Sequence, residues 1–251
     1  TASSQLAASL AKPLLVVDRT AFAAKHAASS TWFAPTTLEE MLRLLVELDS
    51  SCEDGKEQQE RGCKIVVGNT EVGIETRFKR CQYPRLIYPS MSIHELYGFH
   101  CTDNNDGTAH LAIGSCCPLS QIEDSCGLLM KENNMASATA DTGLFRTVRP
   151  IHDMLRWFAS TQIRNVASLG GNLVTASPIA DMNPVLMGLG ATLTLSSFSP
   201  SENVVRRKVA VRSNFFLKYR TVDRKPTELI ECVEIPLLNP VLEYVVPFKQ
   251  A

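Results

Sequence analysis

The sequence has 251 residues, 45% of them hydrophobic, which is enough to bury a substantial core in one large domain or two subdomains. Its 25 Lys and Arg residues nearly balance 26 Asp and Glu, giving a formal net charge of -1. This balance argues against a polyanion or an anionic membrane surface as the main partner. We therefore expect a globular protein that binds neither nucleic acid nor membrane.

The eight cysteines form no CxxC pair and have no histidine partner at a spacing that suggests zinc or iron–sulfur ligation, so the sequence predicts no metal site within the chain. There is also no Asn-x-Ser/Thr sequon and no apolar run of membrane-spanning length. Scattered thiols in such a chain fit a reducing compartment better than a disulfide framework. We expect a cytoplasmic location, with the peroxisome as the alternative.

The first thirty residues are rich in alanine and serine, which favours an interdomain linker over a transit peptide. The run LEEMLRLLVEL that follows has apolar residues at helical spacing, and Thr36 and Thr37 precede it as candidate caps. It predicts a helix over residues 38–48. The polar run from Ser50 to Gly62 interrupts the pattern, and CKIVV at residues 63–67 then predicts a buried strand.

Further strands are predicted at RLIY (85–88), HLAIGS (110–115) and ATLTLSS (191–197), and helices at PLSQIEDSCGLLMK (118–131) and RPIHDMLRWFAS (149–160). These helices and strands do not alternate in regular βαβ units, and no internal repeat is present. The pattern therefore indicates an α+β protein.

Two glycine-bearing segments stand out. The first glycine segment, residues 64–75, reads KIVVGNTEVGIE, in which a β-branched strand runs into Gly68, Asn69 and Thr70. Glycine permits positive φ and lets backbone amides approach a ligand, while Asn69 and Thr70 add neutral donors for phosphate oxygens. An ordinary turn at the end of a strand is the alternative.

The second glycine segment, residues 165–184, reads NVASLGGNLVTASPIADMNP and sets hydroxyl and amide residues among apolar positions. Paired glycines allow close backbone approach, and the flanking polar groups are suited to a pyrophosphate. A structural loop between subdomains is the alternative. Neither segment is a GxGxxG fingerprint or a Walker motif, so any nucleotide site built from them would be of a non-Rossmann type, with two separated loops holding a long ligand by its middle.

At these residues the chain resembles a known family. KIVVGNTEVGIE and RNVASLGGNLVTASPIADMNPV resemble the two FAD-binding signatures of the xanthine dehydrogenase/oxidase (molybdenum hydroxylase) family, in the same order. WFAPTTLEEMLRLL, LRWFASTQIRNVAS, FFLKYR, LIECVEIP and FKQA extend the likeness over residues 31–251. The resemblance implies an α+β, two-subdomain FAD-binding domain of the vanillyl-alcohol-oxidase/PCMH-like type.

The resemblance also implies a domain order. Residues 1–30 would be a linker after an absent iron–sulfur region, 31–90 the N-terminal FAD subdomain, and 91–236 the second FAD subdomain. Residues 237–251 would begin a truncated C-terminal flavoprotein subdomain. Two features depart from the family pattern: Lys218 in FFLKYR replaces a common glycine, and the sequence stops at FKQA, where the next subdomain would begin.

Carried over position by position, the resemblance assigns Phe158 to the isoalloxazine ring, where nicotinamide would arrive, and Asp181 to a polar part of the cofactor. Before the resemblance is considered, Phe158 reads as a core residue beside Trp157 on a predicted helix, and Asp181, Lys249 and Arg220 read as surface charges. The full cofactor-binding set is Lys64, Ile65, Val66, Val67, Gly68, Asn69, Thr70, Glu71, Val72, Ile74, Ala167, Ser168, Gly171, Asn172, Val174, Thr175, Asp181, Ile230 and Lys249.

The function that the resemblance implies is the last electron-transfer step in the reaction of a xanthine dehydrogenase. A molybdopterin centre oxidises hypoxanthine and xanthine to urate, [2Fe-2S] clusters carry single electrons, and FAD passes a hydride to NAD+ or electrons to oxygen. The partners are therefore the iron–sulfur and molybdenum domains of the same parent chain and NAD+, in a homodimeric parent. Hydride transfer requires no protein acid or base, and this chain alone would not hydroxylate purines.

Three alternatives remain at this point. An aldehyde oxidase shares the domain order, but Asn172 and TASPIAD favour the dehydrogenase. The flavoprotein subunit of a carbon monoxide dehydrogenase-like complex is the second alternative, although GNTEVGIE is closer to the multidomain enzymes. The third is a nucleotide-binding or docking module without redox activity, which would lack a yellow flavin absorbance.

Overall fold

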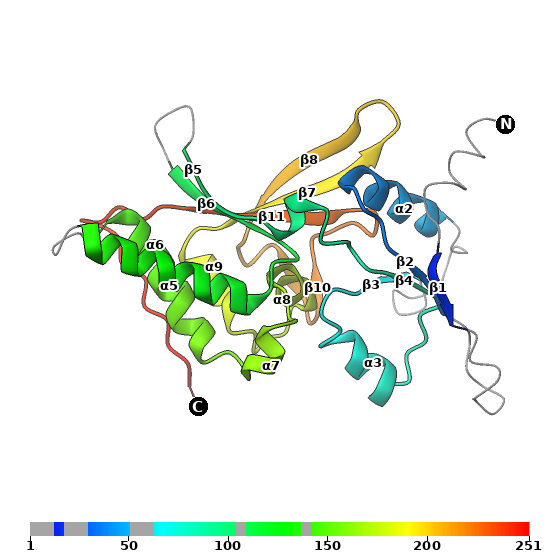
Figure 1. The fold of residues 1–251 in the computed structure, drawn as a ribbon, viewed down its shortest axis with the longest axis horizontal. Coiled ribbons are helices and arrows are strands. Elements are labelled where there is room, and N and C mark those ends of the chain that lie inside the picture. Colours follow the sequence, from blue (N-terminus) through cyan, green and yellow to red (C-terminus); the bar gives the residue numbers. More distant parts are fainter. Residues whose placement is uncertain (1–12, 18–29, 51–62, 104–108, 137–141, 251) are drawn as a thin grey trace. The chain divides into compact units, whose positions relative to one another are not determined.

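The computed structural model describes residues 13–17, 30–50, 63–103, 109–136 and 142–250 (Figure 1). The expected linker and the polar run that ends at Gly62 lie largely outside these residues. Contacts divide the chain into two units. Unit 1 comprises Thr1–Ile93, Ser196–Val205 and Lys225–Leu229, and unit 2 comprises His94–Leu195, Arg206–Arg224 and Ile230–Ala251. The sequence-based domain bounds stay a prediction.

Unit 1 is built on a four-stranded sheet in the order β1-β2-β4-β3. β1 (Pro13–Val17) pairs antiparallel with β2 (Ser30–Phe33), and β4 (Arg85–Ile87) pairs parallel with both β2 and β3 (Cys63–Ile65). The sheet leads at β3 directly into the first glycine segment, which continues into α3 (Val72–Phe78). The sheet therefore fixes where this segment starts.

The helix predicted over residues 38–48 is confirmed as α2 (Leu38–Ser50). The Thr37 hydroxyl accepts a hydrogen bond from the Glu40 amide at 3.2 Å, and Glu40 Oε2 in turn accepts from the Thr36 amide at 2.7 Å. This reciprocal capping satisfies donors that a helix start otherwise leaves unpaired. Met41 and Leu42 are fully buried, as the apolar spacing predicts.

Unit 2 contains most of a five-stranded sheet in the order β5-β6-β11-β7-β8. In this sheet β6 pairs antiparallel with both β5 and β11. In Figure 1 helices α5, α6, α8 and α9 lie on one side of the sheet, and α4 (His94–Tyr97) precedes it in the chain. The strands are β5 (Phe99–Asp103), β6 (Ala109–Gly114), β7 (Thr192–Ser199), β8 (Asn203–Ala210) and β11 (Leu229–Pro236), with a small hairpin of β9 (Phe216–Lys218) and β10 (Thr221–Val222). The helices are α5 (Leu119–Ala136), α6 (Gly143–Arg156), α7 (Thr161–Arg164), α8 (Leu169–Thr175) and α9 (Met182–Gly188).

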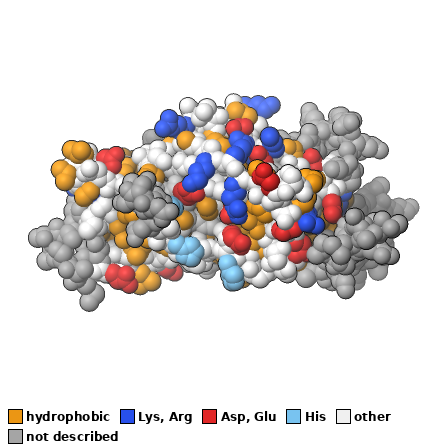
Figure 2. All heavy atoms as spheres, turned by 90° about the horizontal axis from the view of Figure 1, so that it is seen from above, with side chains coloured by type: hydrophobic (Ala, Val, Ile, Leu, Met, Phe, Trp, Pro, Cys, Tyr) orange, Lys and Arg blue, Asp and Glu red, His pale blue; other side chains and the backbone are white. Residues whose placement is uncertain are grey.

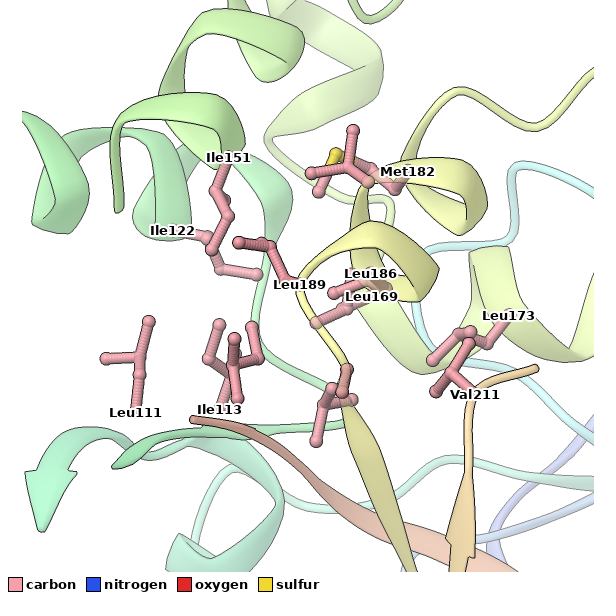
Figure 3. Close-up of a cluster of buried hydrophobic side chains, with 14 of the residues drawn as sticks. Leu111, Ile113, Ile122, Ile151, Leu169, Leu173, Met182, Leu186, Leu189 and Val211 are labelled. Carbon is pink, nitrogen blue, oxygen red and sulfur yellow. The ribbon is translucent and has the colours of Figure 1, made fainter. Parts of the chain in front are cut away.

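The core of unit 2 lies between this sheet and its helices (Figure 3). Leu111 and Ile113 project from β6 toward Ile122 of α5 and Ile151 of α6, and all four are essentially fully buried. Leu169 of the second glycine segment belongs to the same cluster. Burial of these side chains, at roughly 2 kcal/mol each, holds that segment to the sheet.

Charged side chains of unit 2 pair between β8 and β11, which lie on either side of β7 in the sheet. Lys208 Nζ lies 2.6 Å from Glu234 Oε2, and Arg206 Nε lies 2.7 Å from Glu231 Oε2. The view from above in Figure 2 shows Lys and Arg side chains beside Asp and Glu side chains on that face. Such interleaved charges agree with the near-zero net charge of the sequence.

The helix predicted over residues 149–160 is displaced in the structure. α6 runs from Gly143 to Arg156, and the Thr142 hydroxyl caps it by accepting from the Phe145 amide at 3.2 Å. Proline favours the first position of a helix, so Pro150 suggests a start near Arg149, but here it lies inside the helix. Phe158 consequently lies beyond the helix end, in the turn that follows, and not beside Trp157 on a helix.

The described part of the chain contains no helix long and apolar enough to span a membrane. Within the same residues, no group of three or more His, Cys, Asp or Glu side chains is placed to hold a metal ion.

Candidate FAD-binding segments

The first glycine segment offers backbone donors. Val66 is buried, and its amide donates to the Ile87 carbonyl at 2.8 Å. The next four amides, those of residues 67–70, make no hydrogen bond to any described residue. Backbone N–H groups require partners, so four successive unpaired donors in one turn are suited to an anionic oxygen-rich ligand.

The residue with positive φ in this turn is Asn69, with a φ of 57°. The sequence suggests Gly68 for this conformation instead, because glycine adopts it most readily. Asparagine tolerates this conformation better than most residues. Gly73 has a different role, because a Cβ there would lie 3.3 Å from Asn69 Nδ2. The absence of a side chain at Gly73 therefore leaves room for the Asn69 amide group.

Lys64 lies before the turn and is held by α3. Its ammonium is 3.1 Å from Glu75 Oε2, and the Tyr83 hydroxyl donates to the same oxygen at 2.8 Å. Burial would raise the pKa of Glu75, but the bond from Tyr83 and the nearby charge of Lys64 outweigh it and bring that pKa below its usual range. Glu75 is thus a paired carboxylate that fastens α3 to β3.

The apolar residues predicted in this segment divide by exposure. The side chains of Val66 and Val72 are buried in the core of unit 1, so they are committed to packing and do not face a ligand. Ile65 and Val67 are half-buried, and Ile74 is exposed. Glu71 lies 3.8 Å from Lys79, so its charge is partly compensated.

The second glycine segment is helical where a loop was considered. The Ser168 hydroxyl caps α8 by accepting from the Gly171 amide at 3.2 Å. The amide of Gly170 donates to the Ser115 carbonyl at 2.8 Å, and that of Asn172 to the Ser168 carbonyl at 3.1 Å. These backbone donors are therefore occupied, in contrast with those of the first segment.

The two adjacent glycines have different surroundings. A Cβ on Gly170 would lie 2.7 Å from the Ser115 Cβ, so this glycine is required for packing against unit 2 itself. Gly171 is exposed, and a Cβ there would meet only the Ser168 Oγ, at 3.0 Å. Of the pair, only Gly171 presents open backbone to a ligand.

Side chains supply the polar groups of the second segment. Asn172 Oδ1 is buried and has no hydrogen-bond partner among the described residues, and Thr175 is half-buried. A buried unpaired amide oxygen is costly unless a partner arrives. Ala167 and Val174 pack on the core, and Ala176 ends α8 with a φ of 45°. Each segment, taken by itself, therefore presents hydrogen-bonding groups that suit the phosphate-rich part of FAD.

Lys249 brings three predicted residues of unit 2 together. Lys249 Nζ donates to Asp181 Oδ2 at 2.8 Å and to the Trp157 carbonyl at 2.8 Å, next to Phe158. Phe158 is half-buried against the core. Ile230, by contrast, is buried in that core as part of β11, so its side chain is committed to packing.

Arg164 was not singled out from the sequence, although it lies inside the motif RNVAS. Its Nε lies 2.8 Å from Glu123 Oε2 and its Nη1 lies 2.9 Å from the Phe158 carbonyl. Arg220 occupies the turn of the β9–β10 hairpin with a φ of 54°, and Lys218 is exposed beside it. An arginine immediately before a run of small residues was the available signal for Arg164.

A shallow pocket of about 220 Å³ lies in unit 2 between α6 and residues 244–247. No predicted site residue lines it. The hydrogen-bonding groups of the candidate segments therefore lie outside this pocket.

Residues 25–238 match the family model described as the FAD binding domain in molybdopterin dehydrogenase. The chain belongs to this family. The match includes both glycine segments, Phe158 and Asp181, while Lys249 lies beyond it. The resemblance identified from the sequence is thereby confirmed.

Curated relatives agree with the family. Xanthine dehydrogenase of Dictyostelium discoideum is 40% identical over 222 residues, which cover 88% of this chain and 15% of that protein. Xanthine dehydrogenase/oxidase of Gallus gallus is 38% identical over 222 residues, covering 88% of this chain and 14% of that protein. This member of the FAD-binding family therefore spans about one seventh of the length of these relatives.

Solved structures show the same fold. The carbon monoxide dehydrogenase from Hydrogenophaga pseudoflava matches with a TM-score of 0.62 and 18% identity, over 83% of this chain and 59% of that chain. Quinoline 2-oxidoreductase from Pseudomonas putida 86 matches with a TM-score of 0.61 and 21% identity, over 86% and 61%. These likenesses confirm the expected α+β fold class of the FAD-binding domain.

Proposed function

We propose that this chain binds FAD and forms the flavin-dependent electron-transfer part of a xanthine dehydrogenase/oxidase-type oxidoreductase. Electrons would arrive from iron–sulfur clusters and leave to NAD+, or to oxygen, during the oxidation of hypoxanthine and xanthine to urate. The family match and the relatives' names support this assignment. The observation that carries it is the turn of residues 67–70, whose four amides have no hydrogen-bond partner in the described part of the chain and lie in the segment with the family signature.

The bound flavin would supply the redox chemistry, storing two electrons and releasing them as a hydride. The residues of the chain have a binding role. The turn of residues 67–70 would donate backbone N–H groups to the cofactor's phosphates, and Ser168, Asn172 and Thr175 would add side-chain groups. Phe158 would lie at the isoalloxazine ring. Lys249 and Asp181 would hold the neighbouring polar contacts.

The wider assembly is proposed on the same basis. The partners would be the iron–sulfur and molybdenum domains of a longer parent chain, which carry [2Fe-2S] clusters and molybdopterin, and the parent would be a homodimer. A cytoplasmic location, with the peroxisome as the alternative, follows from the thiol content of the sequence. Hydroxylation of a purine would need those other domains.

The test is cofactor retention. Purified protein is mixed separately with excess FAD or FMN, freed of unbound ligand by gel filtration, and its visible absorbance is recorded. We expect a protein-bound flavin spectrum with FAD and much less with FMN, because the proposed contacts reach the pyrophosphate that FMN lacks. Equal retention of FAD and FMN, or no retention of FAD by folded protein, would contradict the proposal.

A further inference from the structure

The turn after α6, residues 157–159, has an unusual backbone. The amides of Trp157 and Phe158 still donate to Met154 and Leu155 carbonyls, at 3.1 and 3.0 Å. The next residue, Ala159, has a φ of 44°, in the left-handed region that an alanine rarely adopts. Such a conformation persists only where surrounding contacts hold it in place.

Arg164 supplies those contacts. Its Nη1 donates to the carbonyls of Phe158 and Ala159, at 2.9 and 3.4 Å, and its Nη2 donates to the Thr161 hydroxyl at 3.3 Å. The rigid, planar guanidinium reaches all three oxygens from one position, which a lysine ammonium does not reproduce. One side chain therefore spans the turn and the start of α7.

The far side of the same guanidinium is anchored in α5. Arg164 Nε lies 2.8 Å from Glu123 Oε2, and the two side chains are only 12% and 19% exposed. A largely buried pair is poorly screened by solvent and salt, so its geometry is well defined. The turn is thereby tied to a helix that packs in the core of unit 2.

The outer side of the turn is held differently. Lys249 donates to the Trp157 carbonyl and to Asp181, and its side chain is 33% exposed. Three successive carbonyls, those of residues 157–159, thus accept from two cations. Among the described residues, only Arg164 donates to the carbonyls of Phe158 and Ala159.

We propose that Arg164 is a positioning residue, which fixes the turn of residues 157–159 so that Phe158 is presented to the flavin. The inference rests on the proposed function for the role of Phe158, and on the hydrogen bonds of Arg164 for the positioning itself. Arg164 touches no reacting atom. Glu123 orients the guanidinium of Arg164 through their ion pair.

The experiment compares Arg164→Gln, Arg164→Lys and Glu123→Gln with Arg206→Gln. The last variant is the matched control, because Arg206 makes an ion pair of 2.7 Å with Glu231 in the same unit, away from the turn. Each protein is saturated with FAD, and the visible circular dichroism and fluorescence of bound flavin are recorded together with the melting temperature. We expect changed flavin signals in all three test variants, smallest in Glu123→Gln, and a signal like that of the wild type in Arg206→Gln.

A second readout needs no flavin. In a Trp32→Phe background, the anisotropy decay of Trp157 reports motion of the turn itself, since the sequence has two tryptophans. Arg164→Gln and Glu123→Gln should increase its fast local motion, and Arg206→Gln should not. If the wild type retains no FAD, the proposed function is wrong. The anisotropy decay of Trp157 still tests whether Arg164 fixes the turn. Unchanged Trp157 motion, or flavin signals that match the control, would overturn the inference.

Discussion

Lys249 and Asp181, 68 residues apart in the chain, are joined by a hydrogen bond of 2.8 Å from Nζ to Oδ2. The same ammonium binds the Trp157 carbonyl at 2.8 Å. Lys249 thus fastens the segment after β11 to both the end of the second glycine segment and the turn that carries Phe158. Because the pair is partly exposed, its effect on stability should be small, whereas its effect on cofactor binding should be larger.

Lys249→Met should therefore weaken FAD binding by about tenfold while lowering the free energy of unfolding by about 1 kcal/mol or less. Lys208→Met is the matched control, because Lys208 makes a comparable pair with Glu234 in the same unit. A fluorescence titration of FAD against each variant gives the dissociation constants. Equal losses of affinity in both variants would show that the Lys249 contact has no specific role.

Glu75→Gln should remove an acid-dependent part of the stability of unit 1. The pKa of Glu75 is below its usual value in the folded chain, so its ionised form stabilises the fold at pH values above the unfolded pKa. That contribution is lost as the pH falls through the folded pKa, which lies below 4.5. Wild type and variant should differ by about 1 kcal/mol at neutral pH and converge in acid.

Urea unfolding across this pH range measures the difference. Glu47→Gln, at an exposed position of α2 in the same unit, serves as the control and should follow the wild type at every pH. A difference between wild type and Glu75→Gln that persists unchanged into acid would mean that the Glu75 charge is not the cause.

The adjacent glycines of the second segment give a paired prediction. Gly170→Ala should destabilise the protein by about 1–3 kcal/mol, because the new Cβ would overlap Ser115. Gly171→Ala, at an exposed helical position, should change stability by less than about 1 kcal/mol and yet reduce FAD retention. Gly171→Val should abolish retention by placing a larger side chain at the ligand-facing position.

Chemical denaturation and FAD retention, measured on the same preparations, separate the two effects. If Gly171→Ala and Gly171→Val both bind FAD like the wild type, the second glycine segment does not face the cofactor.

The thiols should differ in reactivity. Burial raises the pKa of Cys116, Cys117 and Cys126 to about 12, so little reactive thiolate forms at neutral pH. Cys101 is exposed on β5. Mass spectrometry after brief alkylation should find Cys101 modified well before the three buried thiols, and all should react in denaturant. Early modification of Cys117 in folded protein would contradict the buried core described for unit 2.

Local sequence signals predicted part of this fold. The helix α2 follows from its apolar spacing and threonine caps, and the strands near residues 63, 85, 110 and 191 follow from short apolar runs. α6 was misplaced because Pro150 resembles a first-turn proline, while its position inside the helix depends on tertiary packing. The seven-residue helices α3 and α8 were not predicted, because the glycines in both segments lower helix propensity locally.

The sequence predicted which residues belong to the candidate site. It did not predict which of them pack within the protein and which face the ligand. Sequence alone does not distinguish Gly170, which packs on Ser115, from Gly171, which is exposed. Likewise, Lys64 looks like a phosphate-binding cation until Glu75 and Tyr83 are placed around it. Arg164 was missed because its partner, Glu123, lies 41 residues away and is brought close only by the fold.

The most direct test of the account is amide hydrogen exchange with and without FAD, followed by NMR. The amides of residues 67–70 have no partner among the described residues, so they should exchange rapidly in the free protein and slow markedly when FAD binds. The amides of residues 169–172, which are already bonded within unit 2, should change much less. Bound FAD with unchanged exchange at residues 67–70 would contradict the proposed cofactor-binding turn.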